Sequence, residues 1–142
     1  MTRLSSRNCS LLAIVTLFAA ASVALALPPI PKYIPQVLEG KDDYKAFLAD
    51  FKAGDTKCAS CHIPKADKKA KGHALNDFGQ AMHKHLDDKA FMAADKAKDD
   101  ATALKLFNEA WGKAIVDKNE AGQTYAELLK AGKLPGKNPE PK

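Results

Sequence analysis

The 142-residue chain is long enough for one small domain with a leader and tails. Its formal net charge of +5 is too mild to indicate nucleic-acid binding, and its aromatic residues are not interleaved with basic ones. We therefore expect no nucleic acid among its partners. β-Branched residues are few and several segments have helical periodicity, so the sequence predicts an all-α fold.

Residues 1–26 are typical of a secretory signal peptide. Two arginines precede an apolar run over about residues 11–23, and a small-x-small cleavage site ends at Ala26. An uncleaved membrane anchor is the alternative, but the run is marginal for a span of about 20 residues and two prolines follow the cleavage site at once. We expect export to the periplasm and no membrane span after cleavage.

Residues 27–40 carry four of the eight prolines in the chain. Proline fixes φ and removes a backbone donor, so the sequence excludes a helix here and predicts an extended, polyproline-like lead-in. Its apolar side chains would cover the protein's own core, or else dock on a partner. The domain itself is predicted over residues 41–134, with residues 135–142 as a disordered tail.

A first amphipathic helix is predicted to begin at Asp42 and to end at Gly54. The acidic start suits the amino end of a helix. Its apolar stripe has the spacing i, i+3, i+4, i+7 and comprises Tyr44, Phe47, Leu48 and Phe51. We expect this stripe to belong to the core.

Residues 58–62 have the sequence Cys-Ala-Ser-Cys-His, which is the attachment motif of c-type haem. Cys58 and Cys61 can each add across a vinyl group to form a thioether, and His62 then offers an imidazole to the iron. A thiol redox pair or half of a zinc site are the alternatives. A zinc site needs further ligands, and the third cysteine, Cys9, lies in the leader. We predict one covalent haem c.

Three more helices are predicted after a lysine-rich segment at residues 65–72. That segment is either a solvated loop or a surface that steers acidic redox partners. The helices cover residues 76–86, residues 99–117, and a final segment that begins at Thr124, whose hydroxyl forms a capping box with Glu127.

The sixth ligand of the iron is open. His85 is the first candidate because it lies at the edge of the apolar stripe of residues 76–86, whereas His83 falls on the far flank and should meet water. The alternatives are Met92 in a loop-like segment, Met82 at the centre of the stripe, and His73. Methionine would raise the reduction potential and histidine would lower it, while an open position would allow gas or peroxide binding.

Together these motifs resemble those of small exported mono-haem bacterial cytochromes c. The chain is similar to a group in which the haem motif precedes a lysine-rich loop and an Asn-x-Phe/Tyr-Gly stretch, here residues 58–62, 65–71 and 76–79. Residues 122–125 and 131–135 are similar to the closing segments of that group. The chain departs from class I cytochromes c because it has no methionine as far downstream as that class places its ligand.

The resemblance spans most of residues 41–136 and implies a small helical domain packed around one haem. It implies thioethers at Cys58 and Cys61, His62 as the proximal ligand, and electron transfer between redox partner proteins. No catalytic residues are expected, because the haem carries the chemistry. Two alternatives stay open, namely a haem protein with an open distal site and a haem subunit that docks on a larger oxidoreductase through its lead-in.

Overall fold

Residues 30–54, 57–64 and 75–136 are described by the computed structural model of the protein. In the order of the chain, its elements are η1 (a 3-10 helix, Ile30–Lys32), α1 (Tyr33–Leu38), η2 (a 3-10 helix, Asp42–Tyr44), α2 (Lys45–Ala53), α3 (Asp77–His85), α4 (Asp88–Lys96), α5 (Asp100–Ala114) and α6 (Tyr125–Lys130). The described ranges contain only two isolated β-bridges and no strand. The all-α prediction is confirmed for them.

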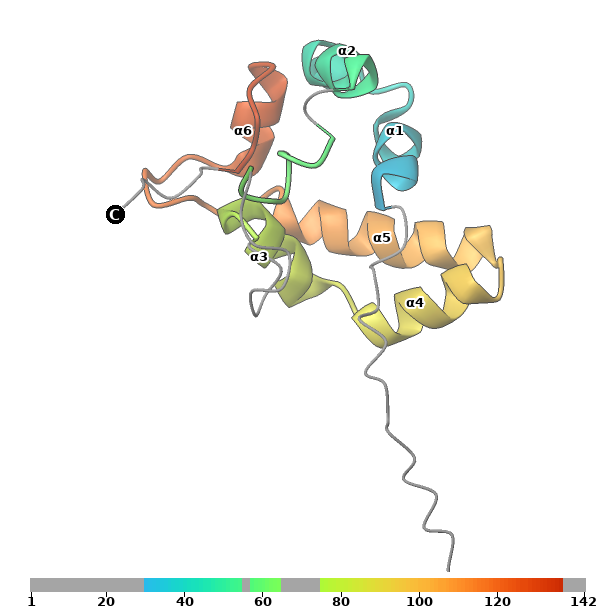
Figure 1. The fold of residues 1–142 in the computed structure, drawn as a ribbon. Coiled ribbons are helices and arrows are strands. Elements are labelled where there is room, and N and C mark those ends of the chain that lie inside the picture. The colour runs from blue at the N-terminus through green and yellow to red at the C-terminus, as the bar shows by residue number, and fades with distance from the viewer. Residues whose placement is uncertain (1–29, 55–56, 65–74, 137–142) are drawn as a thin grey trace, which may run out of the picture.

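Helix α5 is the centre of the packing. It contacts α3, α4 and α1, while α2 packs against α6 (Figure 1). Aromatic rings fill the space between these helices, with Phe78 of α3 in edge contact with Trp111 of α5 at 5.4 Å and with Tyr125 of α6 at 5.1 Å between ring centroids. One apolar core therefore joins the first half of the chain to the second.

The extended lead-in predicted over residues 27–40 is wrong in its described part, which forms η1 and α1. Pro35 is the third residue of α1. The first four N–H groups of a helix have no acceptor within it, so proline costs nothing there. The expected covering role holds, because Tyr33, Ile34, Val37 and Leu38 are buried in the core.

The predicted helices after the lead-in are confirmed with somewhat shorter bounds. η2 and α2 follow each other over residues 42–53, and Gly54 ends them with φ at +116°, a value that suits glycine. α3 begins after Asn76, whose side chain accepts a hydrogen bond from the Gly79 N–H. α6 begins with the expected capping box, since Thr124 and Glu127 bond to each other's backbone N–H groups.

Helix α4 has no counterpart among the predicted elements. It places Met92 in the middle of a helix, where the sequence predicted a loop. The helix starts because the Asp87 side chain accepts hydrogen bonds from the N–H groups of Lys89 and Ala90 at 3.1 and 3.0 Å. The acidic residues after α3 therefore begin a second helix as well as ending the first.

The ends of the chain are described only in part. The predicted signal peptide and the lysine-rich segment lie outside the described residues. Pro135 is buried, so the tail predicted over residues 135–142 is wrong at its first residue. Gly136 lies directly against the side chain of Asn76, and residues 137–142 are outside the described part. Within the described ranges, no helix has the length and apolar character needed to cross a membrane.

The capping box predicts the effect of removing one hydroxyl. Thr124→Ala should lower the free energy of unfolding by about 1 kcal/mol, because the Glu127 N–H loses its acceptor. Urea unfolding followed by circular dichroism measures the change. Thr124→Ser keeps the hydroxyl and is the matched control; equal losses in both variants would contradict the capping role.

Candidate cofactor site

The attachment motif forms a single turn of backbone. The N–H groups of His62 and Cys61 both donate to the carbonyl oxygen of Cys58, at 2.9 and 3.3 Å. Cys58 is exposed, whereas Cys61 and His62 are half-buried. Burial, with a smaller contribution from Cys58, raises the pKa of the Cys61 thiol to about 12. The structure thus brings together the three residues that the motif selected.

Asn76 fastens this turn to the start of α3. Its backbone N–H donates to the Cys61 carbonyl at 2.9 Å, and its side-chain Nδ2 donates to the Ala59 carbonyl at 3.0 Å. Its Oδ1 accepts from the Gly79 N–H at 2.8 Å. Asn76 is only 1% exposed, so its side-chain amide forms these hydrogen bonds away from bulk water. One buried side chain therefore caps the helix and positions the loop.

Gly79 allows α3 to lie directly against the attachment turn. A Cβ at this position would overlap the carbonyl oxygen of Cys61, which is backbone and cannot rotate away. Phe78, its neighbour, points into the aromatic core. The Asn-x-Phe-Gly stretch at residues 76–79 therefore joins the core, the helix and the loop.

A cavity of about 220 Å³ opens beside the motif and includes Cys58, Cys61 and His62 in its wall. The rest of the wall is mostly apolar and comes from three elements distant in sequence. Its apolar residues include Ile30 of η1 and Ile34 of α1, Met82 of α3 and Leu86 directly after it, and Phe107 and Trp111 of α5. Pockets that enclose a whole ligand usually measure about 300–1,000 Å³, so a large cofactor here would leave an edge outside.

Trp111 carries an unused donor in this wall. Its indole Nε1 is buried and has no hydrogen-bond acceptor among the described residues. A buried donor left unpaired costs about 1–3 kcal/mol. Such groups are rare. This nitrogen is covered by protein, so the fit to the predicted cofactor depends on the thiols of Cys58 and Cys61, the imidazole of His62 and the apolar wall beside them.

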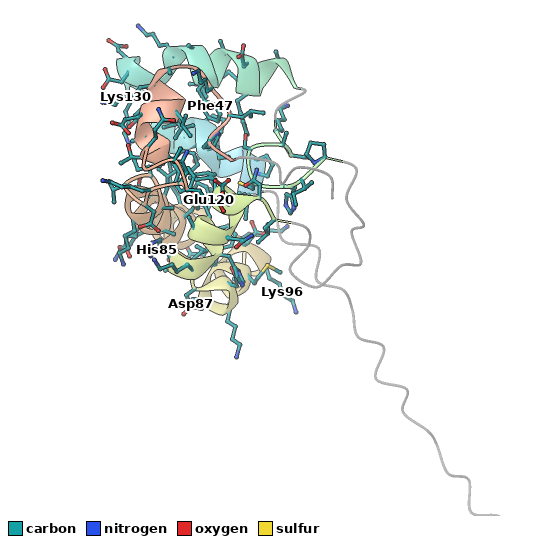
Figure 2. The ribbon with its side chains drawn as sticks, turned by 90° about the vertical axis from the view of Figure 1, so that its left-hand side faces the viewer. Phe47, His85, Asp87, Lys96, Glu120 and Lys130 are labelled. Atoms are coloured by element: carbon teal, nitrogen blue, oxygen red, sulfur yellow. The ribbon has the colours of Figure 1, made fainter. Side chains whose placement is uncertain are left out.

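The structure separates the candidates for the sixth ligand. Met82 lines the cavity and is 5% exposed. His85, the first candidate from the sequence, does not line it; its Nε2 lies 2.9 Å from Asp117 Oδ2. Figure 2 labels His85. Met92 on α4 is also absent from the wall, and His73 lies outside the described residues. The structure therefore places His85 away from the cavity wall and Met82 within it.

His83 lines the cavity, although the sequence did not select it as a ligand. Its side chain is 62% exposed, which agrees with the prediction that it meets water, and it contributes to the cavity wall together with Asp88. His83 Nδ1 lies 2.7 Å from Asp88 Oδ2. The spacing from Gly79 could have identified His83. Residues i and i+4 lie on the same helix face, and Gly79 lies on the face of α3 that contacts the motif.

Comparisons with protein-family models, with curated proteins and with solved structures found no match. In the part of the chain that the structure describes, no three His, Cys, Asp or Glu side chains form a group that would hold a metal ion. The cofactor therefore stays a prediction, and the features of this chain that bear on it are the motif and the cavity beside it.

The close contact at Gly79 predicts opposite effects at two helical glycines. Gly79→Ala should destabilise the protein by about 1–3 kcal/mol, because the methyl group forces α3 away from the Cys61 carbonyl. Gly112→Ala in α5 has nothing within 4 Å and should stabilise by about 0.5–1 kcal/mol. Urea unfolding of both variants tests this; a stabilised Gly79→Ala would refute the contact.

The His85–Asp117 pair predicts a pH dependence. The hydrogen bond from His85, with Lys84 nearby, holds the pKa of Asp117 below its usual value. A lowered folded-state pKa contributes stability above the unfolded pKa of about 3.9, and that stability is lost as pH falls through the folded value. The urea midpoint should therefore fall more between about pH 6 and about pH 3 in the wild type than in Asp117→Asn. Equal decreases would show that the pair does not contribute.

Proposed function

We propose that the protein is an exported c-type cytochrome that carries one covalent haem and transfers electrons between redox partner proteins. Cys58 and Cys61 would hold the haem as thioethers, and His62 would bind the iron. The observation that carries the proposal is the apolar cavity whose wall contains these three groups. The haem supplies one-electron chemistry when bound, and the chain supplies binding, orientation and shielding from water.

The η1–α1 segment supports this function by covering one side of the cavity. Ile30 and Ile34 line the wall. Between them, Lys32 Nζ lies 3.0 Å from Asp95 and 2.9 Å from Asp100, which ties the segment to α4 and α5. Apolar cover around a redox centre limits solvent access and helps to set its potential. The segment therefore acts on the chain's own site, which favours a self-contained carrier over a subunit that docks through its lead-in.

The rim of the cavity supports transfer to a partner. Lys57 is exposed beside Cys58 and contributes to the wall. A cofactor larger than the cavity would leave an edge near this positive charge. Positive charge around an exposed redox edge speeds the encounter with an acidic partner. This arrangement is what an electron carrier requires, and it needs no catalytic side chain.

Maturation in a bacterial host tests the proposal. The full-length protein is made in a host that assembles c-type cytochromes and is purified from the periplasm. The purified protein should be coloured, heavier than the cleaved chain by the mass of one haem, and reversibly reducible. Cys58→Ala combined with Cys61→Ala should abolish covalent attachment. Cys9→Ala, in the predicted leader, is the matched control and should keep it.

Two outcomes would redirect the interpretation. A colourless product with the mass of the bare chain, in a host that matures a reference cytochrome, would refute haem attachment. A haem-loaded product whose reduced Soret band shifts readily with carbon monoxide would favour the alternative of gas or peroxide binding at an open distal site.

A further inference from the structure

We infer that His83 is the sixth ligand of the iron and that Asp88 positions it. The inference rests on the proposed function, since it requires a haem bound at Cys58 and Cys61. It adds a metal-binding residue and a positioning residue that the attachment motif does not contain. The iron would then have two histidine ligands, one from the attachment turn and one from α3.

The position of His83 follows from the contact between α3 and the attachment turn. Gly79 lies against the Cys61 carbonyl. His83 is four residues after Gly79, so the two residues lie on the same face of α3. His83 and His62 both line the cavity, although they come from different elements. The structure therefore offers two imidazoles to one cavity, and only His62 belongs to the motif.

Asp88 gives His83 the arrangement of a metal ligand. The carboxylate oxygen Oδ2 lies 2.7 Å from Nδ1, within ion-pair distance, so Asp88 faces the Nδ1 edge of the ring. A neutral imidazole that carries its proton on Nδ1 has a lone pair on Nε2, which is the atom that a metal would bind. Histidines that bind metals nearly always donate their second ring nitrogen to a carboxylate, a carbonyl or water. Asp88 is the first residue of α4, directly after the Asp87 cap, so its backbone is fixed.

A structural role explains this pair poorly. His83 is 62% exposed, and exposed ion pairs contribute only about 0–1 kcal/mol to stability. His85, by contrast, is 20% exposed and bonded to Asp117, which connects α3 to the chain after α5. The His85 pair belongs to the fold and the His83 pair belongs to the cavity, so the two histidines make a matched comparison.

Met82 is the rival ligand, because it also lines the cavity. Its side chain is 5% exposed and packs within the apolar core, where a methionine needs no metal to account for it. His83, by contrast, has a carboxylate 2.7 Å from its Nδ1. We therefore assign the ligand to His83, and the two assignments have different spectra.

The test uses the matured, haem-loaded protein. The ferric wild type should be low-spin and lack the far-red band of methionine–iron bonding. His83→Ala should become high-spin, bind carbon monoxide when reduced, and regain the low-spin spectrum when imidazole is added. Met82→Leu and His85→Ala should stay low-spin. Asp88→Asn should stay low-spin but have a higher reduction potential, because the imidazole becomes a weaker donor.

Several results would overturn the assignment. They are a far-red methionine band in the wild type that Met82→Leu removes, a high-spin wild type, or a His83→Ala protein that stays low-spin. The wild-type spectrum alone distinguishes an iron bound by two histidines from an iron bound by a histidine and a methionine. The assignment can therefore be tested even if a variant folds poorly. A wild type that matures without haem would instead refute the proposed function, which keeps the two failures distinct.

Discussion

The hydrogen bonds of the Asn76 side chain are the constraint on which the rest of the site depends. The amide joins two backbone segments that would otherwise have unpaired groups, the Gly79 N–H of the α3 amino end and the Ala59 carbonyl of the attachment turn. Each unpaired buried group would cost about 1–3 kcal/mol. Gly136 lies against the same side chain, so the described end of the chain also packs on this junction. The attachment turn is thereby held in one place relative to α3.

Helix α3 contacts both the aromatic core and the attachment turn. Phe78 enters the aromatic core between Trp111 and Tyr125, while Gly79 meets the attachment turn on a neighbouring face. One turn later, Met82 and His83 line the cavity. The same helix therefore fixes the cavity to the core and places both side chains in its wall, because residues three or four positions apart lie on the same helix face.

Local signals in the sequence were sufficient for some elements and not for others. The aromatic stripe of α2 and the capping box at Thr124 act within one or two turns, and both helices formed as predicted. Pro35 argued against a helix but lies in the first turn of α1, where its missing N–H has no consequence. Helix α4 was not predicted because its two buried residues, Phe91 and Ala94, are too few to form a clear apolar stripe.

The positions of the ligand candidates depend on tertiary contacts, which the sequence pattern does not contain. Periodicity within one helix ranks residues by distance from the apolar stripe, which selected His85, but it does not say which neighbour each flank will meet. His85 meets Asp117 at 2.9 Å, and His83 meets the cavity. Only the contact of Gly79 with the Cys61 carbonyl, a tertiary feature, identifies the cavity side. The motif residues could be selected from the sequence because their proposed chemistry depends only on their spacing along the chain.

The three elements that the sequence missed, η1, α1 and α4, are the ones that complete the site. α1 and η1 cover the cavity, and Lys32 fastens them to Asp95 of α4 and to Asp100. α4 also contributes Asp88 at the opposite end of the same helix. A single short helix therefore anchors the cover at its last turn and pairs with a cavity histidine at its first. The proposed attachment chemistry depends on five consecutive residues, whereas the cavity beside them forms only when α1, α3 and α4 meet around α5.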